Sequence, residues 1–155
     1  MKNIQILFTI TLFSILTSCG YSKVNDDSRD FELQNIIING DKKISYILKN
    51  NISLISKSVG AKKYELKINL SNSKKSKIKD VTGRTTRYSL ALIANISLKN
   101  LKNQEVINRS FFIENDFEVS SNHGDTIRNE KNSIENNIER LSDEISKFIQ
   151  LINLN

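Results

Sequence analysis

Few side chains of this chain could do catalytic chemistry, and Cys19, His123, Asp116 and Glu118 are the candidates. His123 is the only histidine, and no spare cysteine exists besides Cys19, so neither a zinc site nor a Cys-His pair can be completed. Asp116 and Glu118 are two residues apart, but strand alternation places them on a polar row with Glu114. We therefore expect no enzyme, no metal and no cofactor; a small envelope hydrolase using His123 or Asp116 is the weakest alternative.

The residues before Cys19 predict a secretory signal peptide. Lys2 supplies a positive charge, residues 4–16 are mostly apolar, and the segment ends in Leu16-Thr17-Ser18. The apolar run is shorter than the roughly 20 residues that cross a bilayer, which disfavours an uncleaved transmembrane anchor.

Leu16-Thr17-Ser18-Cys19 resembles the bacterial lipobox. A lone cysteine in a secreted chain cannot form a disulfide within its own fold, and lipid modification accounts best for its position. Several acyl chains on Cys19 would give a stable membrane anchor. Gly20 stands where lipoproteins kept in the inner membrane usually have Asp, so the resemblance implies the periplasmic side of the outer membrane. We expect a signal peptide over 1–18, a lipidated tether over 19–30 and a single domain over 31–155.

The composition is that of one globular domain. The chain has 155 residues, of which 38% are hydrophobic and 26% charged. The formal charge of +6 falls to +5 when Lys2 leaves with the signal peptide. This excess favours anionic partners such as phosphorylated lipid or nucleic acid, but it is too small to select one of them.

Hydrophobic periodicity predicts a strand and then a helix at the start of the domain. The strand begins at Phe31, and Asn39-Gly40 is typical of a turn. Asp41 is a candidate N-cap for a helix that ends near Gly60. Its apolar stripe consists of Ile44, Ile47, Leu48, Ile52, Ile55 and Val59.

From Tyr64 the period changes to two, which predicts three strands. The first covers 64–70 and is followed by a polar loop, Ser71 to Lys79. The longest alternation, 88–99, predicts the second strand, and a turn at 100–104 leads into the third, 107–119.

The last element predicted is a helix from about Asp125, with apolar residues at alternating steps of four and three: Ile134, Ile138, Leu141, Ile145, Phe148 and Ile152. The stripe is compatible with a coiled coil, but it spans under three heptads and suits a helix that covers a sheet. The order β-α-β-β-β-α predicts an α+β two-layer sandwich. Its four-stranded mixed or antiparallel sheet has two helices packed on one face and the polar face open.

Two segments carry a resemblance to a known family. One is Thr82-Gly83-Arg84-Thr85-Thr86-Arg87-Tyr88-Ser89-Leu90, a basic turn that leads into the longest strand. The other is Phe117-Glu118-Val119-Ser120-Ser121 together with the helix that contains Asn129-Glu130 and Leu141-Ser142-Asp143-Glu144-Ile145. As a pattern of elements and short strings over most of the domain, this resembles the lipopolysaccharide-assembly lipoprotein family LptE, in its alphaproteobacterial form.

The resemblance implies a non-enzymatic role: complex formation with an LptD-type outer-membrane β-barrel and assistance in lipopolysaccharide transport to the outer leaflet, with no nucleic-acid partner. Cations that could hold lipid phosphates are Arg84, Arg87, Lys74, Lys75, Lys77 and Lys79. Solvation alone remains an alternative explanation of these side chains. The alternative function is a lipid-anchored periplasmic adaptor or scaffold with no lipopolysaccharide role, which would bind through the open sheet face.

Overall fold

The structure is a computed structural model, and it describes residues 31–56, 60 and 62–153. The predicted signal peptide, Cys19 and the tether over 19–30 lie outside the described residues.

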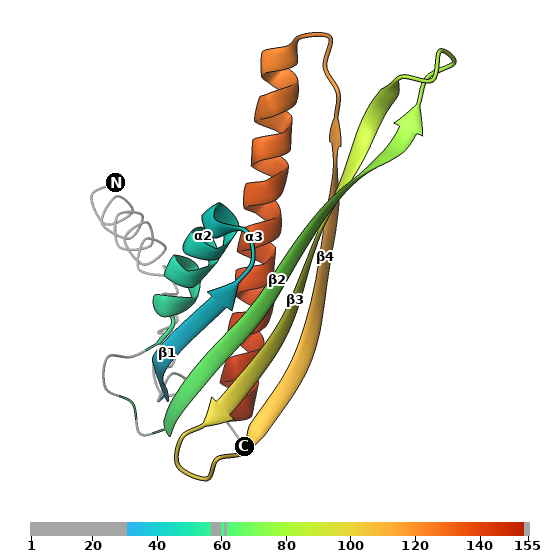
Figure 1. Cartoon of the computed structure of the whole chain (residues 1–155). Helices are drawn as coiled ribbons and strands as arrows, with labels where there is room; N and C mark the ends of the chain where they lie inside the picture. The colour runs from blue at the N-terminus through green and yellow to red at the C-terminus, as the bar shows by residue number, and fades with distance from the viewer. Residues whose placement is uncertain (1–30, 57–59, 61, 154–155) are drawn as a thin grey trace, which may run out of the picture.

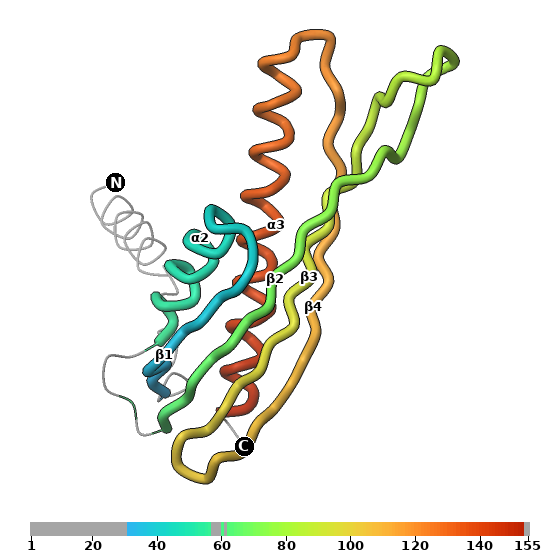
Figure 2. The backbone as a smooth tube through the Cα atoms, in the orientation of Figure 1, coloured from blue at the N-terminus to red at the C-terminus, as the bar shows by residue number. Residues whose placement is uncertain are grey.

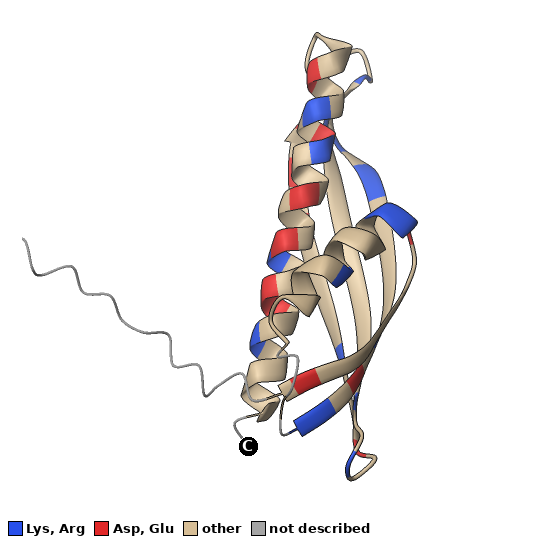
Figure 3. Cartoon of the chain, turned by 90° about the vertical axis from the view of Figure 1, so that its left-hand side faces the viewer, with Lys and Arg blue, Asp and Glu red and all other residues tan. Residues whose placement is uncertain are grey.

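The elements follow the predicted order β-α-β-β-β-α (Figure 1). They are β1 (Phe31–Asn39), α2 (Lys42–Ser53), β2 (Lys62–Lys79), β3 (Thr85–Asn100), β4 (Val106–Glu118) and α3 (His123–Asn153). The sheet order is β1-β2-β3-β4, with β1 parallel to β2 and the other pairs antiparallel. Both helices lie on the same side of this mixed sheet (Figure 3), which confirms the predicted fold class.

The core lies between the two helices and the sheet face that they cover, and all four strands contribute buried residues to it. Leu48 and Ile52 of α2, Leu66 of β2, and Leu141 and Ile145 of α3 are all fully buried there. The apolar stripe of α3 therefore packs inside this chain, as expected of a helix that covers a sheet, and burial of such side chains stabilises the domain.

Asp41 caps α2 as predicted, because its Oδ1 accepts hydrogen bonds from the backbone N–H groups of Lys43 and Ile44, both at 3.0 Å. The prediction that this helix continues to near Gly60 is wrong, since α2 ends at Ser53. The Ser53 hydroxyl donates to the Asn50 carbonyl, and short polar side chains of this kind compete with helical hydrogen bonds. Val59 lies outside the described residues.

Gly60 has a different reason to be glycine. A Cβ atom there would lie 2.5 Å from the backbone carbonyl carbon of Phe31. The residue allows the chain to pass close to the start of β1, rather than stopping the helix.

The predicted polar loop Ser71 to Lys79 is also wrong, because these residues extend β2 and pair with β3 as far as Lys79 opposite Thr85. The segment lacks an apolar row because all nine of its residues are exposed. With no core to face, a strand shows no alternation of apolar and polar residues. We call residues 71–89 the distal ribbon; they comprise the end of β2, the turn that follows it and the start of β3.

Different elements lie at the two ends of the molecule. β1 begins, and α3 ends, at the same end (Figure 2). The turn between β2 and β3 lies at the opposite end, where the distal ribbon diverges from α3 (Figure 1). At about 3.3 Å per residue, the 18 residues of β2 separate these ends by about 60 Å.

Candidate functional site

The turn at the end of the distal ribbon, residues 78–85, is the ribbon tip, and it is organised around Asp80. The Asp80 Oδ1 accepts hydrogen bonds from the Thr82 hydroxyl at 2.6 Å and from the N–H groups of Thr82 and Arg84 at 2.8 and 3.0 Å. These bonds, led by that from the Thr82 hydroxyl, lower the pKa of Asp80. Gly83 has a φ of 82°, which favours glycine. The tip is thus a defined turn.

The outer surface of the ribbon tip combines apolar and cationic groups. Val81 is fully exposed and Ile78 is 45% exposed. Arg84 lies in the turn directly before β3, so it belongs to the loop, and its side chain has no ion-pair partner among the described residues. The same holds within those residues for Lys79, the last residue of β2. The tip therefore offers two uncommitted cations beside exposed aliphatic side chains.

Arg87 is arranged differently from Arg84. It faces Glu118 across β3 and β4 and forms an ion pair with that carboxylate. Both side chains are more than a third exposed, so the pair contributes little stability. Arg87 is nevertheless committed to a partner within the chain, and the structure does not group it with Arg84.

Lys74 lies on the helix side of the distal ribbon. Its Nζ is 2.7 Å from Glu130 of α3 and 4.6 Å from the centre of the Tyr88 ring, which stacks on Phe117. Cation-π and ionic contacts together link the ribbon to α3 here. Lys74 therefore serves as a brace between the two elements.

The other lysines divide into one paired and two uncommitted side chains. Lys77 forms an ion pair with Asp116 at 2.7 Å. Lys75 and Lys79 have no ion-pair partner within the part of the chain that the structure describes. Of the six cations expected to hold phosphate, Arg84, Lys75 and Lys79 remain available.

The residues considered for catalysis are not brought together. His123 is exposed at the first position of α3, and Asp116 and Glu118 are each in an ion pair with a cation of the ribbon. In residues 31–56, 60 and 62–153, no group of three or more His, Cys, Asp or Glu side chains could hold a metal ion. Among those residues, too, no helix has the length and apolar character needed to cross a membrane.

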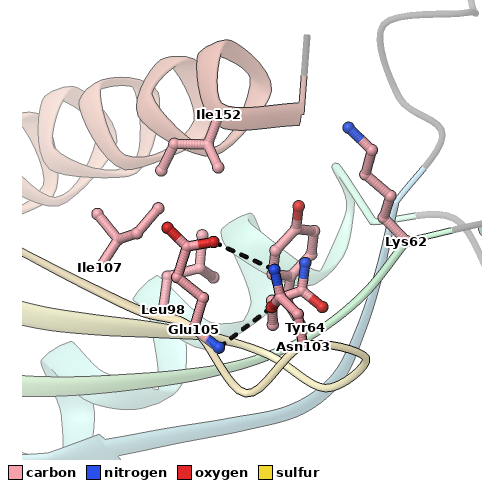
Figure 4. A pocket seen from close by; sticks show the side chains of 8 residues that line it. Lys62, Tyr64, Leu98, Asn103, Glu105, Ile107 and Ile152 are labelled. Atoms are coloured by element: carbon pink, nitrogen blue, oxygen red, sulfur yellow. Dashed lines mark hydrogen bonds between the residues drawn. The ribbon is translucent and has the colours of Figure 1, made fainter. Parts of the chain in front are cut away.

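A pocket of about 460 Å³ at the opposite end of the molecule was not foreseen from the sequence (Figure 4). Tyr64, Glu105 and Lys62 are among its polar lining, with Asn100 and Asn103, while Leu98 and Ile152 are among its apolar lining. Burial raises the pKa of the Tyr64 phenol, and the charge of Glu105 raises it further. The Lys62 Nζ donates to the Asn153 carbonyl at 2.7 Å. In the sequence Tyr64 was visible as one member of an apolar row, without a sign of this pocket.

Comparison with known proteins shows similarity in fold. No protein-family model and no curated protein sequence matches the chain. Among solved structures, the chain is similar to the rare lipoprotein B from Shewanella oneidensis, with a TM-score of 0.61 and 13% identity over 78% of this chain and 97% of that one.

Two further structures of lipoproteins have the same fold. One is a putative lipoprotein from Caulobacter crescentus, with a TM-score of 0.54 and 14% identity over 77% of this chain and 91% of that one. The other is an uncharacterized lipoprotein B from Nitrosomonas europaea, with a TM-score of 0.55 and 13% identity over 84% of this chain and 91% of that one. The chain thus has the fold of a class of small bacterial lipoproteins.

Proposed function

We propose that the chain is a lipoprotein anchored through Cys19 to the periplasmic side of the outer membrane. It forms a complex with an LptD-type β-barrel and assists lipopolysaccharide transport to the outer leaflet, without catalysis and without a cofactor. The lipobox-like sequence, the family resemblance of the β3 and α3 segments and the fold shared with lipoproteins support this proposal.

The ribbon tip is the single observation that carries the proposal. Arg84 and Lys79 are uncommitted cations next to the exposed Val81. A lipid that carries phosphates beside its acyl chains can use both the cationic and the apolar contacts of the tip. An Arg guanidinium can hold two phosphate oxygens at once. The tip and the start of β1 lie at opposite ends of the described structure (Figure 2).

Affinity purification from detergent-solubilised outer membrane tests the proposal. We expect a large β-barrel to copurify with the wild-type chain in a one-to-one ratio, as identified by mass spectrometry. Recovery of soluble or inner-membrane partners in place of a barrel would support an adaptor and contradict the proposal.

A second candidate function, the adaptor, is favoured by one feature of the open sheet face. Ile93 of β3 and Phe112 of β4 are register partners, and both lie on the sheet face that points away from the core. Phe112 is 60% exposed. Aromatic residues of this kind often anchor protein interfaces. If the adaptor function is correct, Phe112→Ser abolishes partner recovery while Arg84→Ala leaves it unchanged; the barrel function predicts a loss with Arg84→Ala.

A further inference from the structure

β2 is longer than its neighbour β1, so one side of its distal half has no paired strand. Pairing with β1 stops at Asn69, opposite Asn39, whereas β2 continues to Lys79 (Figure 1). On its other side β2 stays paired with β3 along this stretch. The distal half of β2 therefore has one paired edge and, among the described residues, one unpaired edge.

A hydrogen bond at the end of β3 shows which backbone groups of β2 face the unpaired edge. The Lys63 carbonyl accepts from the Leu101 N–H at 2.9 Å, so odd-numbered residues of β2 direct their N–H and C=O groups toward β3. The register is regular as far as Ser76, so even-numbered residues face the other side up to that point. Gly40, which follows β1, agrees with this, because a Cβ there would lie nearest to the Leu70 carbonyl oxygen.

Beyond the end of β1, these outward groups belong to Asn72, Lys74 and Ser76, which we call the free edge. All three residues are exposed. Their backbone N–H and C=O groups have no hydrogen-bond partner within the described part of the chain. Exposed groups of this kind are a template on which an extended segment can pair as an additional strand.

The opposite edge of the sheet, along β4, is less available. The Arg140 side chain of α3 donates to the Glu114 carbonyl at 3.3 Å, and the Asn129 side chain donates to the Glu118 carbonyl at 3.1 Å. Side chains of α3 thus occupy backbone acceptors in the distal part of β4. The free edge of β2 has no such cover among the described residues.

The charges along the free edge favour an acidic partner. Residues 71–79 contain four lysines and no acidic residue. Lys74 points toward the helices, where it contacts Glu130, so Lys75 lies on the opposite, open face of the sheet. Lys75 has no ion-pair partner in the described ranges. Opposite charges on neighbouring strands stabilise their pairing, so a carboxylate beside Lys75 would add to the backbone hydrogen bonds.

A hollow of about 290 Å³ beside Asn72 leaves room for a side chain on the helix face of an added strand. Ile44 of α2 and Ile134 of α3 are among its apolar lining. Its border carries charges of both signs: Asp41, Lys43, Glu130, Lys131 and Glu135. A neutral side chain therefore fits this side better than a charged one.

The acidic residues that precede β1 are too close to it in sequence to reach the free edge. The first of them, Asp26, is five residues before Phe31, a span of at most about 18 Å. Phe31 is opposite Lys62, and ten residues of β2, about 33 Å, separate Lys62 from Asn72. The acidic segment must therefore come from another molecule.

We propose that the free edge binds an extended segment of another protein as an added strand, with acidic side chains beside Lys75 on the open face and neutral side chains on the helix face. Backbone hydrogen bonds hold the segment, and Lys75 selects its charge. This surface is separate from Arg84 at the ribbon tip and from Phe112 on the open face. The inference does not rest on the proposed function.

Three synthetic peptides test the proposal. The probe is acetyl-Thr-Val-Glu-Val-Glu-Val-Thr-amide, which alternates acidic and neutral residues and reads the same in both directions. The second peptide has Lys in place of both Glu. The third keeps both Glu but carries N-methyl groups on its five central residues, which remove the N–H donors and block strand pairing.

Binding is measured by fluorescence anisotropy with the chain from residue 19, in which Cys19→Ser removes the predicted lipid. The probe should bind at least tenfold more tightly than either of the other peptides. Equal binding of the N-methylated peptide would overturn the proposal, because it would show that the lysines attract charge without strand pairing. No measurable binding of the probe would overturn it as well.

Amide hydrogen exchange followed by NMR locates the bound peptide. In the free chain, the N–H groups of Asn72, Lys74 and Ser76 should exchange faster than those of Ser73 and Lys75, which face β3. Saturation with the probe should slow exchange at the free edge at least tenfold. Unchanged exchange there would overturn the proposal. So would protection in the chain alone together with a dimer in analytical ultracentrifugation, which would assign the edge to a second copy.

Charge variants test the selectivity. Lys75→Glu should weaken the acidic probe at least tenfold and strengthen binding of the lysine peptide. Lys102→Glu makes the same change in net charge in the turn between β3 and β4, away from the free edge, and is the matched control. Binding of the probe that is unaffected by Lys75→Glu, or weakened equally by Lys102→Glu, would overturn the proposal.

A backbone variant tests the pairing itself. Asn72→Pro removes an outward N–H while leaving the bonds to β3 in place, and should weaken the probe at least tenfold. Asn72→Ala keeps that N–H and should bind the probe as the wild-type chain does. Equal binding by the two variants would overturn the proposal. The charge variants and the N-methylated peptide decide the matter if Asn72→Pro does not fold.

Discussion

Arg87 of β3 forms an ion pair with Glu118 of β4 directly across the two strands, whereas Arg84, three residues earlier, projects from the turn with no such partner among the described residues. Two arginines that look equivalent in the sequence therefore have different roles. The same division separates Lys74 and Lys77 from Lys75 and Lys79. Each uncommitted cation has a paired neighbour of the same type, which provides an internal control.

We expect Arg84→Ala to weaken lipopolysaccharide or barrel binding at least tenfold, with the loss shrinking at high salt. Arg87→Ala should weaken binding much less and change the free energy of unfolding by about 0–1 kcal/mol, the range for exposed ion pairs. Binding assays at two salt concentrations and urea unfolding check both. Equal losses of binding in the two variants would show that the tip does not act through its uncommitted arginine.

Leu141→Ala should lower the free energy of unfolding by about 2–5 kcal/mol, because Leu141 of α3 is fully buried in the core. Leu151→Ala, at a position 60% exposed on the same helix, is the matched control and should have little effect. Urea unfolding followed by circular dichroism measures both. If Leu141→Ala instead abolished a dimer at constant stability, the stripe would be a coiled-coil seam.

Gly40→Ala should destabilise the domain by at least about 1–3 kcal/mol, the usual cost of a non-glycine residue in disfavoured backbone space. Gly40 has a φ of 142°, and a Cβ there would lie 2.5 Å from the Leu70 carbonyl oxygen. Gly83→Ala provides the comparison, since Gly83 also has a positive φ but a Cβ there meets nothing within 4 Å. A thermal melt that ranks Gly83→Ala as the more damaging change would contradict the close packing of β1 and β2 at Gly40.

The raised pKa of Tyr64 predicts a loss of stability in alkaline solution. The folded chain holds the phenolic proton more tightly than the unfolded chain, so this contribution is complete below the unfolded pKa of about 10 and is lost as pH rises through the folded pKa. Ultraviolet titration of tyrosinate, with Tyr64→Phe to assign the transition, checks the direction. Glu105→Gln should shift that transition to lower pH while burial still keeps it above the ordinary value; an unchanged midpoint would exclude the charge of Glu105 as a cause.

Cys19→Ser should release the chain from the membrane or leave an unprocessed precursor, because the lipobox-like sequence places the predicted anchor on this residue. Alkaline extraction of membranes followed by immunoblotting distinguishes these outcomes. Mature-sized protein that still resists extraction would exclude Cys19 as the attachment point.

Elements that face the core were predictable from sequence, and elements that do not were missed. The α3 stripe around Leu141 and the β3 alternation around Leu92 report burial directly, so their periods identified them. The stretch from Ser71 to Lys79 has both faces in solvent, and its strand structure depends on pairing with β3, a nonlocal contact. The hydrophobic period does not reveal the end of α2 at Ser53, because the apolar stripe continues beyond it to Ile55.

The candidate site was predictable in position but not in detail. The sequence located a basic turn at Gly83 and Arg84, and that turn is the ribbon tip. The register that pairs Arg87 with Glu118 could not be foreseen, because it depends on how β3 and β4 align. The pocket beside Tyr64 forms where β2, β3, β4 and the end of α3 meet, and the sequence alone does not show which side chains come together there.

The early end of β1 has a consequence for solubility. β1 pairs with β2 up to Asn39 opposite Asn69, so residues 71–79 present a strand edge with no strand paired on that side among the described residues. Such an edge can template pairing with another molecule, and lysines are a common means of preventing this. Lys75 and Lys79, which have no ion-pair partner among the described residues, therefore also repel a second copy of the ribbon, and neutralising both would expose the protein to edge-to-edge aggregation.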